Sequence, residues 1–259
     1  MDFTSFLEII LSNWHLLLLF FCVAFCYASV GFGGGSSYLA ILTLTGIAYT
    51  QIRATALLCN IVVVAGNVVL FQKEKAIPWK KVLPLTLFSV PFAFMGGAVI
   101  ITQQFFFILL GGTLLFAAST MWRSKKEGVS AKNTPVFSLQ KNASYGGAIG
   151  FLSGMVGIGG GIFLAPLLHL THWDRPKKIA ATASFFILVN SFSGLLGQFT
   201  NPAFAIDGPF TVLLLVTVFI GGQLGRRFSN RFFTAIQLKK ATAILIALVS
   251  LRILWKYLF

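Results

Sequence analysis

Two glycine-rich segments are the residues best suited to chemistry in this sequence. The first is Gly31-Phe-Gly-Gly-Gly35 and the second is Gly157-Ile-Gly-Gly-Gly161. Each interrupts a long apolar stretch, so a helix should begin directly after each break. The free N–H groups and the positive dipole at a helix N-terminus bind anions, and glycine lets the backbone approach a ligand closely. Two such ends that face each other would form one central anion site. The alternative is that the glycines only permit close helix packing.

Polar residues inside the apolar stretches are the second group of candidates. Asn60 and Asn190 lie partway along the stretches that follow the two breaks, where they would line the wall of a central site. Interhelical hydrogen bonding is the alternative role for each of them. The candidate substrate-binding residues are therefore Gly33, Gly34, Gly35, Ser36, Ser37, Asn60, Gly159, Gly160, Gly161 and Asn190. The second break is followed by Ile162 and Phe163 rather than by serines, so an asymmetric site is expected.

The sequence contains no convincing set of residues for catalysis or for metal binding. The three cysteines lie inside apolar runs without metal-ligand spacing. His169 and His172 could share a helical face as a metal site or a proton relay, but they have no carboxylate or thiolate partner, which favours an interfacial location. No activated nucleophile with a base is recognisable. We therefore expect no catalytic residue, no metal and no cofactor.

Two arginines inside apolar stretches have open roles. Arg53 begins a stretch and is expected to anchor it at the outer membrane interface, where it could also attract an anion. Arg252 lies deep in the last stretch. It either extends outward to the interface together with Lys256 or faces the bundle as an anion contact.

The amino-acid composition indicates that these residues belong to a membrane protein. Of 259 residues, 57% are hydrophobic and only 10% are charged, against about 25% in soluble domains. The mean hydropathy is +0.87. These values exclude a water-soluble enzyme, a disordered chain and a small disulfide scaffold, and they favour an all-α integral membrane protein. The net charge of +14 then indicates membrane topology rather than a nucleic-acid partner. Because Met1–Leu11 contains no Lys or Arg, we expect a retained membrane segment there rather than a signal peptide.

Six stretches have the length and hydrophobicity of membrane spans, which need about 20 residues. They are residues 54–71, 82–101, 105–122, 179–199, 209–225 and 238–257. Two further apolar regions, 12–46 and 143–171, contain the glycine breaks. Arms 143–156 and 162–171 are too short to span, so the second region is expected to be a re-entrant hairpin, and the first one by analogy.

Lysine and arginine set the expected orientation. Four connections hold 17 of the 20 basic residues: those between the first two spans, in the central linker, after the second break and before the last span. Positive loops stay in the cytoplasm. If all four are cytoplasmic, region 143–171 must enter and return on the same side, and the N-terminus lies outside.

The two halves of the chain resemble each other. Each has a break, then Ala-Thr-Ala (residues 54–56 and 181–183), then a Gly-Gly pair (residues 96–97 and 221–222). A hairpin plus three crossings per half is an odd number, so the second half should be inverted, as in many secondary transporters. The expected organisation is a first membrane repeat at 1–122, a cytoplasmic linker at 123–142 and a second membrane repeat at 143–259.

The segments Gly31–Tyr38 and Ser153–Gly161, each opening one half, resemble the paired motifs of the TauE/SafE family of sulfite and organosulfonate exporters. The resemblance covers nearly the whole chain. It implies a multi-pass transporter of the inner cell membrane that moves a small anion, sulfite, an organosulfonate or a related sulfur compound, usually by export and without a cofactor. Proton coupling fits this interpretation. The alternatives are an anion channel of the re-entrant type and, from a different class, an intramembrane enzyme or a subunit of a membrane complex. The expected partners are the small anion and the lipid bilayer; the sequence leaves the oligomeric state open.

Overall fold

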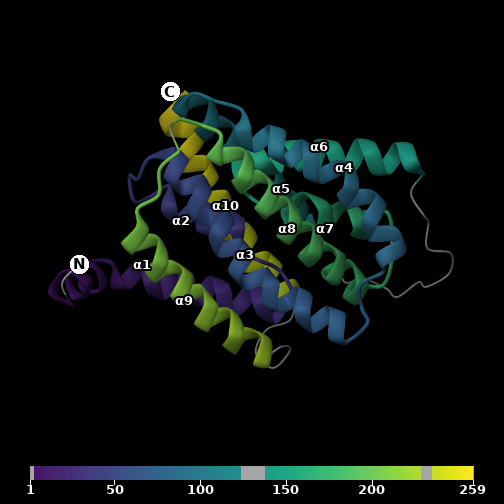
Figure 1. Cartoon of the computed structure of the whole chain (residues 1–259), viewed down its shortest axis with the longest axis horizontal. Helices are drawn as coiled ribbons and strands as arrows, with labels where there is room; N and C mark the ends of the chain where they lie inside the picture. The colour runs from purple at the N-terminus through teal and green to yellow at the C-terminus, as the bar shows by residue number, and fades with distance from the viewer. Residues whose placement is uncertain (1–2, 124–137, 203, 229–234, 259) are drawn as a thin grey trace.

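The structure is a computed structural model that describes residues 3–123, 138–202, 204–228 and 235–258 (Figure 1). These residues form a helical bundle and contain no strand. The helices, in chain order, are α1 (Phe3–Ser29), α2 (Gly35–Leu42), α3 (Tyr49–Lys73), α4 (Trp79–Ala98), α5 (Gln103–Arg123), α6 (Leu139–Val156), α7 (Gly161–Leu170), α8 (Pro176–Phe199), α9 (Gly208–Arg227) and α10 (Ala235–Leu258). Most of the expected linker, residues 124–137, lies outside the described part of the chain.

Six helices in the described residues are long and apolar enough to cross a membrane: α1 through its part Ile10–Ser29, then α3, α4, α5, α8 and α9. The last five correspond to five of the six spans expected from the sequence. The sixth expected span, residues 238–257, falls within α10, which is 24 residues long. The prediction of an all-α membrane protein is confirmed.

The first broken region departs from the expected pair of short arms. Helix α1 has 27 residues, and 20 of them form a span-length apolar segment, whereas α2 has only 8 residues. No glycine or proline precedes Gly31, so nothing interrupts α1 before the break. Helix α6 also begins earlier than expected, at Leu139, because Ser138 Oγ caps it by accepting a hydrogen bond from Lys141 N at 3.4 Å.

A glycine stripe joins α6 to α4. Gly146, Gly150 and Gly154 follow one another at intervals of four residues, so they lie on one face of α6. A Cβ atom on each would clash with a backbone carbonyl of α4, those of Leu85, Ser89 and Ala93 respectively. Residue numbers rise together on the two helices, so α4 and α6 run parallel. Small residues at such intervals let membrane helices approach to backbone contact.

Glycines also bring α9 into backbone contact with α1. Gly221 and Gly225 of α9 lie against the backbone carbonyls of Phe21 and Phe25 of α1, and these helices also run parallel. The helices of the two halves can be matched in chain order, α1 with α6 through α5 with α10. With this matching, most pairs of helices in contact have a counterpart pair. The pair α4–α6 corresponds to α9–α1, α4–α8 to α9–α3, α7–α8 to α2–α3, α6–α8 to α1–α3, and α10–α2 to α5–α7. The packing therefore repeats the internal similarity of the sequence.

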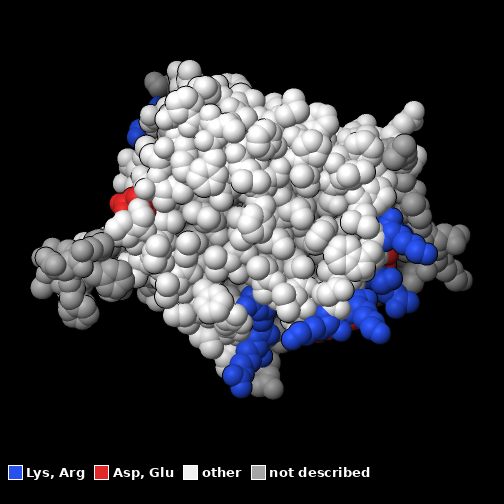
Figure 2. Space-filling view, in the orientation of Figure 1, with Lys and Arg blue, Asp and Glu red and all other residues white. Residues whose placement is uncertain are grey.

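Charged residues gather at one end of the bundle, which we call the basic end. It comprises the α3–α4 and α7–α8 connections and the C-terminus of α9. Figure 2 shows Lys and Arg along the lower right edge of the molecule, while most of the visible face carries no charge. The opposite end holds the start of α3, the α4–α5 connection and the end of α10, because Tyr49 Oη donates to Ile101 O at 2.8 Å and Gln104 Nε2 donates to Tyr257 O at 3.3 Å.

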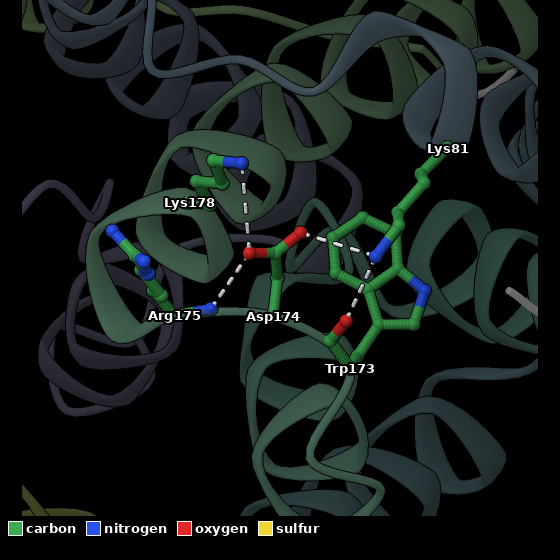
Figure 3. Close-up of polar contacts among 5 residues, drawn as sticks. All are labelled: Lys81, Trp173, Asp174, Arg175 and Lys178. Atoms are coloured by element: carbon green, nitrogen blue, oxygen red, sulfur yellow. Dashed lines mark hydrogen bonds and ion pairs between the residues drawn. The ribbon is translucent and has the colours of Figure 1, made fainter. Parts of the chain in front are cut away.

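A small ionic cluster holds the two connections at the basic end together (Figure 3). Lys81 Nζ of α4 lies 3.1 Å from Asp174 Oδ2 and donates to Trp173 O at 3.1 Å, and Lys178 Nζ lies 3.8 Å from Asp174 Oδ1. Burial by itself would raise the pKa of Asp174. The backbone N–H of Arg175 and the charges of Lys81 and Lys178 outweigh burial and hold this pKa below its usual value.

Candidate functional site

The two glycine breaks have similar backbone conformations. Gly34 precedes α2 with φ of 89°, and Gly160 precedes α7 with φ of 84°; both angles lie in the left-handed region that favours glycine. No side chain in the described part of the chain caps the N-terminus of either helix. The first N–H groups of a helix have no acceptor within the helix. Each break therefore presents backbone donors and the positive end of a helix dipole.

The two breaks meet in the interior of the bundle. A Cβ atom on Gly35 would lie 2.7 Å from the carbonyl oxygen of Ile158, so the first break contacts the second. Asn60 of α3 lies between them: its Nδ2 donates to Ile158 O at 2.9 Å, and its side chain fills the space beside Gly33 and Gly35. The expectation that two helix ends from opposite halves face one centre thus agrees with the geometry.

Among the described residues, four of the eight buried side-chain polar atoms without a hydrogen-bond partner lie beside glycines of the breaks. Asn60 Oδ1 lies against Gly33, Ser191 Oγ is 2.7 Å from where a Cβ of Gly159 would be, and Tyr38 Oη is 3.3 Å from the corresponding position of Gly34. Ser153 Oγ, on the residue that contacts Gly160, also has no partner. A buried polar group without a partner is destabilising. The four atoms at the breaks are therefore available to bind a polar ligand or water.

The structure places the candidate residues from the sequence in three surroundings. Asn60 comes together with Gly33 and Gly35 of the first break and with Gly159 of the second. Ser36 and Ser37 are buried at the start of α2, where Ser37 Oγ pairs with Tyr27 Oη at 3.1 Å. Asn190 instead faces α4, because its Nδ2 donates to Ser89 Oγ at 3.0 Å and to Phe186 O at 2.8 Å.

Ser191, the neighbour of Asn190 on α8, lies beside the second break. Adjacent positions on a helix point about 100° apart, so only one of the two side chains can face the break. Polar residues occur on more than one side of this part of α8, so the sequence pattern does not show which of the two faces the break. The contact between Ser191 Oγ and Gly159 shows that Ser191 faces the break.

Arg53 is not the interfacial anchor expected from the sequence. Only 1% of its surface is exposed, and one Nη donates to the carbonyl oxygens of Gly97 at 3.4 Å and Gly154 at 3.2 Å. The backbone of Arg53 also touches Gly157, the first glycine of the second break. The expectation was wrong because α4 and α6 approach the start of α3 and bury it. A charged side chain inside a membrane costs roughly 3 kcal/mol on insertion scales, so this burial needs a reason.

Other polar residues lie away from the centre. Arg252 is exposed on α10, which agrees with the outward-facing alternative. His172 lies beyond the end of α7 with φ of 49°, so it does not share a helical face with His169. Within the residues that the structure describes, no group of three or more His, Cys, Asp or Glu side chains is placed to hold a metal ion.

Comparison with known proteins agrees with this architecture. The family model described as sulfite exporter TauE/SafE matches residues 16–253. The chain is 32% identical over 244 residues to the probable membrane transporter protein y4hK of Sinorhizobium fredii, covering 93% of this chain and 97% of that protein. It is 23% identical over 231 residues to the probable membrane transporter protein YunE of Bacillus subtilis, covering 79% and 84%. No solved structure gives a significant match.

Proposed function

The chain belongs to the sulfite exporter TauE/SafE family, and from this we propose that it is a secondary transporter of a small anion, namely sulfite, an organosulfonate or a related sulfur compound. That the protein is a multi-pass membrane transporter and not an enzyme follows from the family and from its six span-length apolar helices. The substrate, export as the direction of transport, proton coupling and location in the inner cell membrane are the proposed part.

The observation that carries the proposal is the meeting of the two breaks. Two helix N-termini point their dipoles at one buried place, where hydroxyl groups of Ser191 and Ser153 and the Asn60 amide have unpaired polar atoms. Backbone N–H groups and hydroxyls can donate to the oxygens of a sulfite or sulfonate group. Asn60 Oδ1 can accept from a proton on the substrate, as in hydrogen sulfite. We therefore propose Gly33, Gly34, Gly35, Asn60, Gly159, Gly160 and Gly161 as the substrate-binding residues, with Ser191 added.

The packing also supports the proposed inverted repeat. Helix α1 runs parallel to α9 and ends at the basic end, whereas its equivalent α6 runs parallel to α4 and begins there. Equivalent helices thus point in opposite directions. In this proposal, the tightly packed pairs α4–α6 and α9–α1, each with one helix from either half, rock against each other about the breaks and alternately open the centre to each side, with the basic end in the cytoplasm.

Reconstitution in liposomes tests the function. We expect saturable flux of sulfite or of a sulfonate such as methanesulfonate, with sulfate and chloride moved more slowly, and faster flux when a pH gradient is imposed. Accumulation against the substrate gradient distinguishes a coupled transporter from the alternative, an anion channel, which can only equilibrate its ion. Absence of flux for all these anions in correctly folded preparations contradicts the proposal.

A further inference from the structure

Arg53 carries a buried charge that has no ionic partner among the described residues. None of the ion pairs formed by the described residues includes it, whereas Lys81 at the basic end is paired with Asp174. Its hydrogen bonds go to two backbone carbonyls from a single Nη, and its Nε has no partner. The guanidinium therefore retains donor capacity inside the bundle.

The position of Arg53 connects it with the paired breaks. Arg53 and Asn60 lie seven residues apart on α3, so they point to the same side of the helix. A Cβ atom on Gly157 would lie 3.1 Å from Arg53 Cα, and Asn60 donates to Ile158 O. One face of α3 thus lies along the second break from Gly157 to Gly159. The Arg53 guanidinium is at the start of this face, and the unpaired Asn60 Oδ1 is two helical turns further on.

The two carbonyl contacts explain how the side chain is held but leave its charge available. Gly97 and Gly154 are near the C-terminal ends of α4 and α6, where carbonyl groups lack intrahelical partners and the helix dipoles are negative. A purely structural role would end with these two contacts. It would leave unexplained the free Nε and the choice of a full charge, because a neutral amide donor can also bond to a carbonyl.

We infer that the Arg53 guanidinium binds the substrate directly on the side of the breaks away from the basic end. Its Nε donates to one oxygen of an oxyanion, and the adjacent Nη donates to a second oxygen in exchange for one of its two carbonyl contacts. The planar fork of arginine matches two oxygens of a sulfite or sulfonate group, which a lysine ammonium matches less well. The inference rests on the proposed function and adds to it the residue that supplies the positive charge.

The test compares Arg53→Gln, Arg53→Lys and Arg226→Gln with the unchanged protein. Glutamine keeps a donor for the carbonyls of Gly97 and Gly154 but removes the charge. Arg226 is the matched control, because its Nη also donates to a backbone carbonyl, that of Val63, but at the C-terminal end of α9. The two measurements are sulfite flux in liposomes and the rise in melting temperature that sulfite produces in detergent, since a ligand of the folded state stabilises it.

We expect Arg53→Gln to lose the sulfite-induced rise in melting temperature and to reduce flux at subsaturating sulfite at least about tenfold. Arg226→Gln should keep both. An Arg53→Gln protein that retains the sulfite-induced rise and the KM overturns the inference even if its Vmax falls, because that pattern is the one a purely structural arginine gives. Absence of anion flux and anion-induced stabilisation in the unchanged protein overturns the proposed function, and the inference with it.

If Arg53→Gln does not accumulate in the membrane, Arg53→Lys tests whether the guanidinium binds the substrate. Lysine keeps the charge but not the fork, so we expect KM to rise about tenfold while Vmax changes little. An unchanged KM for sulfite in Arg53→Lys contradicts two-point binding by the guanidinium and overturns the inference.

Discussion

At the scale of single residues, Asn60 is the point where both halves of the chain converge. Its Nδ2 donates to Ile158 in the second break, while its side chain packs on Gly33 and Gly35 of the first. A glycine at those two positions is required because a Cβ atom would collide with the amide. The asparagine and the glycines therefore form one unit, and a change in any of them should affect both breaks.

Replacing Asn60 by alanine tests this unit. We expect transport to fall at least about tenfold, because Ile158 O loses its donor and the contact between the breaks loosens. Flux in liposomes, normalised to folded protein, is the measurement. Thr113→Ala is the control, since Thr113 Oγ1 donates only to Leu110 O within α5. Equal flux in Asn60→Ala and the control would show that Asn60 has no part in transport.

Asp174 makes a prediction about pH. Its pKa is lowered in the folded protein by Arg175 N–H, Lys81 and Lys178, against the effect of burial. A carboxylate with a lowered folded pKa adds stability above its unfolded pKa of about 3.9, and that stability is lost as the pH falls through the folded value. We therefore expect Asp174→Asn to lower the melting temperature at pH 7 and to weaken the loss of stability below about pH 4.

Melting curves in detergent between pH 3 and pH 7 measure this difference. Glu74→Gln serves as a comparison, because Glu74 pairs with Lys177 at 3.1 Å but both side chains are well exposed. An exposed pair contributes little. Superimposable pH profiles for Asp174→Asn and the unchanged protein would contradict the prediction.

At the scale of helices, glycines define the closest interfaces. The stripe Gly146, Gly150 and Gly154 brings α6 against the backbone of α4, and Gly221 with Gly225 does the same for α9 and α1. Without a hydrophobic driving force between helices in lipid, such close packing is a main source of their association. These interfaces link a helix of one half to a helix of the other, so they also fix how the two halves fit together.

Gly150→Leu should disrupt the α4–α6 interface, because the new side chain would meet the backbone of Ser89. We expect destabilisation of about 2 kcal/mol or more from overpacking. Gly112→Leu on α5 is the matched control, since a Cβ atom there meets nothing within 4 Å. Thermal unfolding in detergent compares the two variants, and equal melting temperatures would mean that the stripe is not a tight interface.

At the scale of the whole molecule, the two ends of the bundle differ in charge. The basic end carries the connections on which the proposed topology depends, and ion pairs join two of them, Lys81 to Asp174 and Lys177 to Glu74. If one of these connections is cytoplasmic, the other must be too. From the positive-inside rule we propose that the whole basic end is cytoplasmic.

Cysteine labelling checks this orientation. Starting from a variant in which Cys22, Cys26 and Cys59 are replaced, we expect a cysteine at His172 to react with a membrane-impermeant maleimide only when the cytoplasmic side is accessible. A cysteine at Gln104 should react from the opposite side. Both positions are exposed and lie at opposite ends of the bundle. Labelling of both from the same side would contradict the proposed topology.

The sequence by itself determined the membrane class, the helical fold, the ends of most spans and the two breaks, because hydrophobicity, charge in loops and glycine act locally along the chain. It also pointed to Asn60. Only the tertiary structure decided which side chains face the centre: Ser191 rather than Asn190 beside Gly159, and Arg53 inside the bundle rather than at its surface. Helices in lipid are apolar all round, so their sequence lacks the polar face that reveals orientation in water. The neighbours that bury a residue, here α4 and α6 around Arg53, come from distant parts of the chain.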